Sequence, residues 1–174
     1  MDAITTERLD LVLLTAERIE AVLADGNAER TIAGLLVPAG WPDEHDANFL
    51  RLRLGQIRAR PADEVWLARA IVLRGDETRP MIGHIGFHNP PKDGALELGY
   101  TVFEAWRRQG VASEAALGMM RWAREAHGVR RFVVSISPEN APSLAMAERL
   151  GFERTGEHMD EEDGLEYVFE LVVE

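Results

Sequence analysis

One segment near the middle of the chain does most to limit its fold, because it predicts a strand, a tight turn and a helix in succession. The strand covers residues 95–103, and the helix covers residues 110–126. A helix N-terminus presents unpaired N–H groups and the positive end of the helix dipole, so it can hold a phosphate without side-chain charge. Gly110 and Ala112 are small, which lets a ligand approach this backbone closely. The turn is therefore a candidate anion site, the alternative being an ordinary helix start beside a surface arginine pair.

The rest of the chain alternates strands and helices in the same way. Glycine and proline interrupt residues 32–42, and two prolines with Asp93 and Gly94 mark a turn at residues 89–94. Further strands are predicted at residues 5–14, 65–73, 81–88, 131–136, 153–159 and 165–172, and helices at 16–24, 43–58 and 141–150. This order predicts an α/β chain on a mixed sheet, in one domain over residues 1–174.

Composition excludes several classes of protein. The 174 residues contain no cysteine, which removes disulfides, thiolate metal sites and a cysteine nucleophile. A net charge of -11 argues against nucleic-acid binding, which needs clustered Lys and Arg. The same charge suits an amine-bearing partner, although it also serves solubility alone. With no membrane-length apolar run and no signal-peptide pattern at the N-terminus, we expect a cytoplasmic protein without membrane contact.

A second motif follows the strand at residues 131–136. Asn140 is suited to cap the next helix, and Pro142 fits its first turn. Ser143 follows, and the helix leads into the sequence ERLGF at residues 148–152. Taken alone, Asn140 and Ser143 are as well explained as helix-start residues.

Together, R-x-x-G-x-A at residues 107–112 and N-x-x-S-x-x-x-x-E-R-L-G-F at residues 140–152 resemble the GNAT acetyltransferase superfamily. TERLDL at residues 6–11 and ELGY at residues 97–100 are similar to the branch that contains the ribosomal-protein alanine N-acetyltransferases. The resemblance covers nearly the whole chain. It implies a mostly antiparallel sheet of six to seven strands, with a central strand splay and helices on both faces.

The resemblance also implies how acetyl-CoA would bind. Its pantetheine arm would lie in the splay, bonded by the backbone of Val102 and reached by Asn140, with Ser143 near the sulfur. The pyrophosphate would be held by the Arg107 side chain and by the backbone amides of Arg108, Gln109, Gly110, Val111, Ala112 and Ser113.

Two positions depart from the usual pattern of the superfamily. Many members have glycine where this chain has Arg108, so the arginine must project outward or onto a phosphate. Members outside this branch often have a tyrosine, which protonates the thiolate, at the position of Ala147. Ser143 is the replacement that the ribosomal-type branch suggests.

Amide formation needs a neutral acceptor amine placed against the thioester carbonyl. An α-amine titrates near about 8 and needs little help, whereas a lysine amine near about 10.4 needs a base. Glu97 is our candidate base, directly or through water, and we expect burial to raise its pKa. A surface carboxylate or an arginine partner is the alternative for this residue.

Several residues are candidates for the acceptor pocket. His84 and His88 share one face of their strand, but without cysteine or nearby acids we expect no metal there. We assign Trp41, His84 and Tyr100 to the pocket, while Trp41 also suits loop packing and either histidine suits the core or the surface.

These observations predict an N-acetyltransferase that joins acetyl-CoA to a primary amine by direct attack in a ternary complex. The amine could belong to a protein N-terminus or to a small molecule. The alternative is a non-catalytic acyl-CoA-binding or regulatory module on the same fold. A homodimer through the closing strands and the DEEDG turn is a further possibility.

Overall fold

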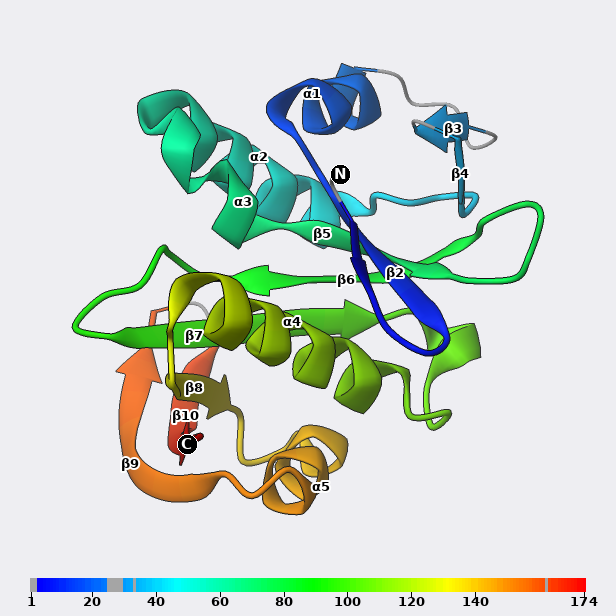
Figure 1. Cartoon of the computed structure of the whole chain (residues 1–174). Coiled ribbons are helices and arrows are strands. Elements are labelled where there is room, and N and C mark those ends of the chain that lie inside the picture. The colour runs from blue at the N-terminus through cyan, green and yellow to red at the C-terminus, as the bar shows by residue number, and fades with distance from the viewer. Residues whose placement is uncertain (1–2, 25–29, 33, 162) are drawn as a thin grey trace.

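The computed structural model describes residues 3–24, 30–32, 34–161 and 163–174. Within them, the main sheet has eight strands in the order β1-β2-β5-β6-β7-β8-β10-β9. All neighbouring pairs are antiparallel except β7 and β8, which are parallel (Figure 1). The prediction of a mixed, mostly antiparallel sheet is confirmed.

The strands of the main sheet are β1 (Ala3–Thr5), β2 (Leu9–Leu13), β5 (Arg69–Leu73), β6 (Met81–Phe87), β7 (Ala95–Val102), β8 (Arg131–Ile136), β9 (Glu153–Asp160) and β10 (Gly164–Val172). A separate pair is formed by β3 (Arg30–Ile32) and β4 (Leu35–Val37). The helices are α1 (Ala16–Ala24), α2 (Glu44–Ala59), α3 (Glu64–Leu67), α4 (Val111–His127) and α5 (Ala141–Arg149), with short 3-10 turns at Pro61–Asp63 and Glu104–Trp106.

Two of the predicted strands differ from the structure by more than one residue. Where one strand was predicted at residues 5–14, β1 ends at Thr5 and β2 starts only at Leu9, because Thr6 N–H bonds to the Leu9 carbonyl and reverses the chain into a hairpin. This hairpin adds a strand to the predicted number. The segment at residues 65–73 begins as helix α3, and β5 starts only at Arg69. The Leu67 carbonyl lies where a Cβ on Gly86 would be, so the glycine makes room for the end of α3.

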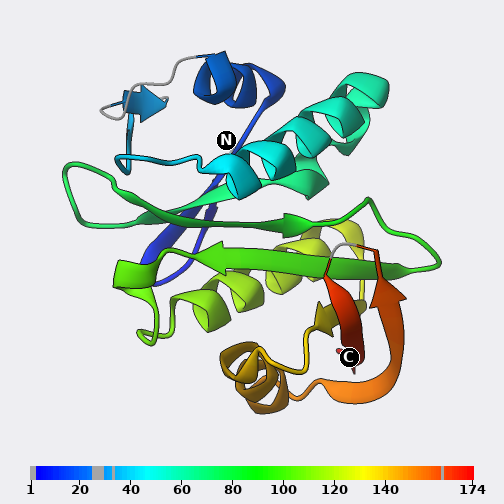
Figure 2. The same ribbon diagram turned by 180° about the vertical axis from the view of Figure 1, so that it is seen from behind.

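Helices cover both faces of the sheet (Figure 2). One hydrophobic core joins α4 and α5 to the sheet, with Phe87 and Phe132 fully buried in it. The other core lies under α1 and α2 and contains Leu50 and Ile57. Strand β6 is buried along its whole length, which explains its nearly continuous apolar sequence.

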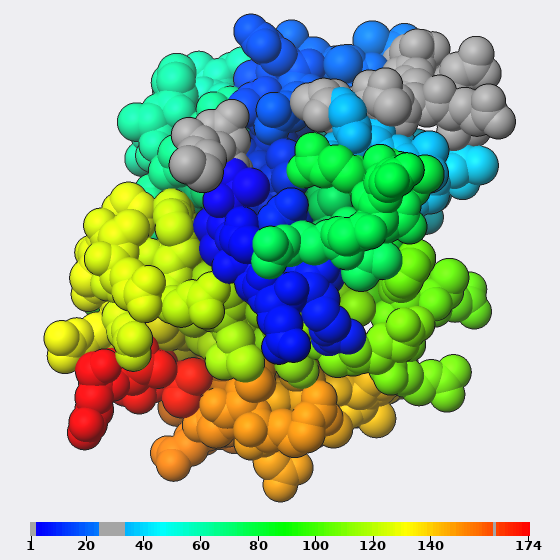
Figure 3. Space-filling model, turned by 45° about the vertical axis from the view of Figure 1, so that its right-hand side comes forward, coloured from blue at the N-terminus to red at the C-terminus, as the bar shows by residue number. Residues whose placement is uncertain are grey.

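The N-terminal hairpin lies against α4 (Figure 3). A Cβ on Gly118 would come within 2.7 Å of the Thr6 Cγ2, so glycine allows the close crossing. The Glu114 carboxylate accepts from Thr6 Oγ1 at 2.6 Å and from the Arg8 backbone N–H at 2.7 Å. These contacts fix the start of α4 relative to the sheet. None of the helices in the described ranges has the length and hydropathy needed to cross a membrane.

Candidate active site

Strands β7 and β8 separate in the middle of the sheet. They pair only from Ala95 with Arg131 to Glu97 with Val133, although β7 continues to Val102. The predicted splay is therefore present, and it opens just beyond Glu97.

The splay exposes one edge of the β7 backbone. In an antiparallel ladder, alternate residues bond to the same neighbour. Phe103 N–H bonds to the Ile82 carbonyl, so the main-chain groups of Tyr100 and Val102 face away from β6 and toward the gap. The Val102 carbonyl accepts from Arg107 Nε at 3.0 Å. An extended ligand could pair with the remaining groups as an added strand does.

The turn into α4 lies at the end of this edge. Gly110 is the N-cap, with φ 77°, and as glycine it has no side chain to cap the helix. The first helical bond runs from Glu114 N–H to the Gly110 carbonyl at 3.0 Å. The N–H groups of residues 111–113 precede that bond, so they are the orphan donors of the helix. Such a cradle of donors can bind an anion, and the phosphate site at this turn stays a prediction.

The side chains around the turn hold its shape. Arg108 has φ 59°, in the left-handed region that glycine adopts most readily. Gln109 donates from its side chain to the Ala105 carbonyl at 3.1 Å, and its own carbonyl accepts from Arg8 Nη1 at 3.0 Å. Arg8 also pairs with Glu114 at 2.6 Å. The turn is thus fastened from the side of the N-terminal hairpin.

A polar contact spans the splay from β7 to α5. Tyr100 donates from its hydroxyl to Ser143 Oγ at 2.9 Å. Ser143 is held in turn by Asn140, whose Oδ1 accepts from the Ser143 N–H at 3.2 Å. Burial raises the pKa of Tyr100, so its hydroxyl stays protonated at neutral pH. The structure therefore brings together three predicted site residues, Tyr100 of β7 and Asn140 and Ser143 at the start of α5.

Glu97 lies in a second polar group on the opposite face of β7. Its Oε1 accepts from Ser135 Oγ at 2.7 Å, and its Oε2 lies 3.6 Å from His88 Nδ1. The pKa of Glu97 is lowered to about 2, first by His88 and also by Ser135, against the opposing effect of burial. The prediction of a raised pKa was wrong, because these partners stabilise the charged carboxylate more than burial opposes it.

An aromatic wall lies on this same face of the sheet. Trp41 and Phe103 are 6.1 Å apart between ring centroids. His84 is buried beside them, stacked on Phe49 at 4.8 Å, with its Nε2 3.0 Å from the Asp46 carboxylate. His84 therefore supports the wall from inside, whereas Trp41, Phe49 and Phe103 are half-buried.

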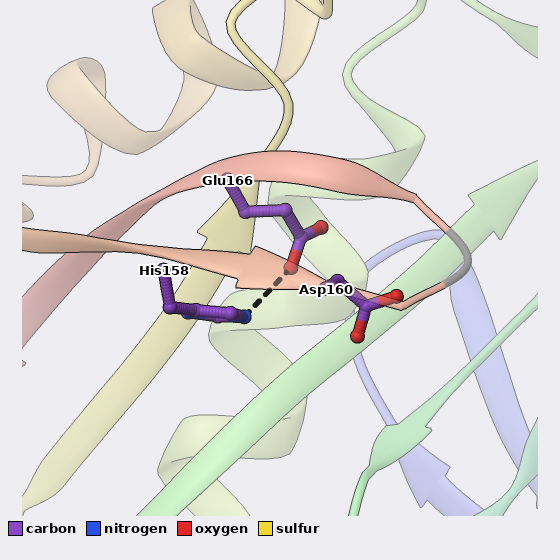
Figure 4. A group of neighbouring side chains, drawn as sticks. All are labelled: His158, Asp160 and Glu166. Atoms are coloured by element: carbon purple, nitrogen blue, oxygen red, sulfur yellow. Dashed lines mark ion pairs between the residues drawn. The ribbon is translucent and has the colours of Figure 1, made fainter.

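A third polar group lies on the β9–β10 hairpin (Figure 4). His158 Nε2 is 3.2 Å from Glu166 Oε2, and Asp160 lies beside them. The ligand-type atoms of these three residues lie within 4.8 Å of one another. Burial raises the pKa of Glu166 against the opposing effect of His158, and neighbouring acids add to the rise. The cluster of His158, Asp160 and Glu166 does not include His84, which we considered from the sequence for a metal site. Asp160 Oδ1 accepts a hydrogen bond from the Asp163 N–H at 2.9 Å.

Sequence reasoning missed the partners of Glu97. The sequence places His88 on the same strand face as His84 and Ser135 within the predicted strand at residues 131–136, and it links neither residue to Glu97. No sequence spacing links them, since they come from the end of β6 and from β8. The alternation of Ser135 with buried Val134 and Ile136 was the available signal for a polar side chain turned to one face.

Comparison with known proteins gives a family match over most of the chain. Residues 8–153 match the family model described as the acetyltransferase (GNAT) domain. The uncharacterized N-acetyltransferase p20 of Bacillus licheniformis is 30% identical over 126 residues, covering 67% of this chain and 71% of that protein. The ribosomal protein uS5-alanine N-acetyltransferase of Escherichia coli is 28% identical over 82 residues, covering 46% of this chain and 42% of the enzyme.

Solved structures share the fold. The microcin C7 self-immunity acetyltransferase MccE, in complex with acetyl-CoA and AMP, matches with a TM-score of 0.63 at 14% identity. The match covers 97% of this chain and 94% of that one. Most of the curated relatives match this chain over about half of their length.

Proposed function

The chain belongs to the acetyltransferase (GNAT) domain family, and on that premise we propose that it transfers the acetyl group of acetyl-CoA to a primary amine. The observation that supports this most directly is the splay between β7 and β8, with a glycine-capped helix N-terminus at its mouth. MccE, which has this fold, is in complex with acetyl-CoA. The reaction we propose is direct attack of the amine in a ternary complex.

Residues 107–113 would hold the pyrophosphate, through the orphan N–H groups at the start of α4 and the charge of Arg107 and Arg108. The main-chain groups of Tyr100 and Val102 that face the gap would bond the pantetheine arm. Asn140 caps α5 with its Oδ1 and would present its side-chain N–H groups to the arm. Bound in this way, acetyl-CoA supplies an activated acetyl group at the deep end of the splay.

Ser143 would protonate the leaving sulfur. Its hydroxyl accepts a hydrogen bond from Tyr100, which orients the Ser143 proton away from the tyrosine. That orientation leaves the proton free to reach a sulfur in the splay. Tyr100 stays protonated and can return a proton to Ser143. The pair would do the work that a single tyrosine does in other branches of the family.

The acceptor would approach from the face that carries Trp41 and Glu97. The carboxylates of Glu97 and Glu166 lie on this face, and the chain has a net charge of -11, so an ammonium group would be attracted to it. The E. coli relative is an alanine N-acetyltransferase of a ribosomal protein, which favours a peptide α-amine as the first acceptor to test.

The test is turnover of acetyl-CoA with a panel of peptide N-termini, polyamines and aminoglycosides. Release of free thiol, together with the mass of an acetylated product, would support the proposal. Calorimetry with acetyl-CoA runs in parallel. Tight binding without turnover on any amine would contradict it and favour the non-catalytic module.

A further inference from the structure

We propose that His88 is the base that takes the proton from the acceptor amine, with Glu97 and Ser135 as the residues that position it. This inference rests on the acetyl transfer proposed above. It assigns a role to a histidine that lies outside the motif residues and at the end of a different strand.

The three side chains form a line across neighbouring strands. Ser135 on β8 donates to Glu97 on β7 at 2.7 Å, and the other Glu97 oxygen lies 3.6 Å from His88 Nδ1. A carboxylate beside one ring nitrogen fixes the orientation of an imidazole and the position of its proton. The ring therefore turns Nδ1 toward Glu97 and presents Nε2 as its basic nitrogen.

That second nitrogen lies beside the opening of the splay. A Cβ built on Gly99 would come within 2.7 Å of His88 Nε2, so the ring covers β7 at this residue. Gly99 lies two positions beyond Glu97, the last residue of β7 that pairs with β8. The basic nitrogen is thus next to the first unpaired part of the strand.

The proposed base and acid lie on opposite faces of the same strand. Successive residues of a strand point to opposite faces, so Gly99 faces His88 while Tyr100 faces Ser143. An amine that attacks from the His88 side would therefore expel the sulfur toward the Ser143 side. The base and the acid can therefore reach the tetrahedral intermediate from different sides, the base at the amine nitrogen and the acid at the sulfur.

Glu97 itself is poorly suited to accept the proton. Its pKa of about 2 makes it a much weaker base than an imidazole, which ordinarily titrates near about 6.5. The negative charge of Glu97 instead stabilises the imidazolium that forms when His88 takes the proton.

The surroundings hold His88 in place. From α2, Arg53 and Gln56 donate to the His88 carbonyl at 2.8 and 3.1 Å. Glu97 is the charged group facing the ring from β7, and His158 on β9 acts electrostatically on Glu97. The two donors fix the backbone of His88, and Glu97 beside Nδ1 orients its ring, as a preorganised catalytic group requires.

These residues account for every proton that moves during the transfer. The amine nitrogen bonds to the acetyl carbon and loses one proton to His88 Nε2. The carbon–sulfur bond breaks, and the sulfur leaves with the electron pair and takes the Ser143 proton. Tyr100 then gives its proton to Ser143. After the products leave, solvent takes the extra proton from His88 and returns a proton to Tyr100.

The first experiment is kcat/KM against pH for the parent, His88→Ala and Glu97→Gln, with the best amine of the panel. We expect His88→Ala to lower kcat about 100-fold and to leave only the rising limb that ionisation of the acceptor amine itself produces, with acetyl-CoA affinity unchanged. Glu97→Gln should lower kcat less than His88→Ala does, because the carboxylate that orients the ring is replaced by a neutral amide while the imidazole remains. His127→Ala, at the exposed end of α4, is the control histidine.

A parent-like profile for His88→Ala would overturn the base assignment alone. A parent enzyme that binds acetyl-CoA but acetylates no amine would overturn the proposed function, and the base with it.

Gly99→Ala gives a second route that leaves His88 intact. The new methyl group must push the imidazole aside, so kcat should fall while acetyl-CoA affinity is kept. The double variant with His88→Ala should be no slower than His88→Ala, since the methyl acts only through the ring. If the losses in kcat of the two single variants add in the double variant, the placement of Nε2 is contradicted. The comparison remains valid when the kcat of a variant is corrected for its folded fraction.

Discussion

At the scale of single residues, Arg108 adopts a conformation that favours glycine, with φ 59°. Left-handed backbone costs a non-glycine residue about 1 kcal/mol, and glycine returns a similar amount through the greater entropy of its unfolded chain. We therefore expect Arg108→Gly to leave the melting temperature nearly unchanged. Its loss of charge should weaken acetyl-CoA binding several-fold at low salt, and less at high salt. Calorimetry of the parent and the variant at two ionic strengths checks this. If the two proteins bind acetyl-CoA with equal affinity at both ionic strengths, the Arg108 side chain lies away from the phosphates.

Ser143 gives the second prediction at this scale. Ser143→Ala removes the hydroxyl that Tyr100 contacts at 2.9 Å but keeps the Asn140 cap, which uses only the Ser143 backbone. We expect kcat to fall about 10- to 100-fold, with acetyl-CoA affinity within about twofold of the parent. Steady-state kinetics and calorimetry measure the two effects. Tyr100→Phe should give a smaller loss, and unchanged kcat in Ser143→Ala would remove the residue from the mechanism.

At the scale of elements, α4 offers a matched pair of glycines. Gly110 begins the helix with φ 77°, and Gly128 ends it with φ 70°. Gly110→Glu and Gly128→Glu therefore impose similar backbone strain, but only the first places a negative charge in the phosphate cradle. We expect Gly110→Glu to abolish acetyl-CoA binding in calorimetry and Gly128→Glu to retain it. Loss of binding in both would mean that helix stability, and not the cradle, is being measured.

The anchoring of α4 to the N-terminal hairpin predicts a pH dependence of stability. Burial opposes the charge of Glu114, but bonds from Thr6 and from the Arg8 backbone and side chain outweigh it and lower its pKa. Because the pKa of Glu114 is lower in the folded protein than in the unfolded chain, its charge stabilises the fold at pH values above the pKa of the unfolded chain. This stabilisation is lost as the pH falls through the pKa of the folded protein. Between about pH 5 and about pH 3, unfolding free energy should fall more in the parent than in Glu114→Gln. Glu125→Gln, exposed on the same helix, should follow the parent in urea titrations.

At the scale of the whole molecule, charge should bias the choice of acceptor. With a net charge of -11, the protein attracts cationic acceptors over distances of about 10 Å at moderate salt. We expect kcat/KM for a lysine-rich peptide to fall as salt rises, and kcat/KM for a glutamate-rich peptide of equal length to rise. Parallel salt responses for the two peptides would show that acceptor choice depends on local contacts alone.

The edge of the sheet bears on oligomeric state. Strand β9 ends the main sheet and is exposed along nearly its whole length, with Met159 72% exposed. An open edge can pair with another strand. A homodimer through β9 stays a prediction, which light scattering of the parent and of Met159→Lys would check.

The fold could be read from the sequence wherever periodicity and capping agreed. Strand β8 and helix α1 have the predicted bounds, and Asn140 caps α5 as its residue type suggested. The hairpin at the N-terminus could not be read in this way. Its reversal depends on bonds from Thr6 and on the crossing over Gly118, which is far away in the chain.

The sequence by itself determined the glycine-capped turn into α4, because strand, turn and helix there are consecutive and their backbone chemistry is local. It also placed Asn140 and Ser143 at the start of α5. Only the tertiary structure decided the state of Glu97, whose charge depends on His88, just after β6, and on Ser135 of β8. The physical reason is that a pKa sums desolvation and neighbouring dipoles in space, and sequence spacing fixes neither across a sheet.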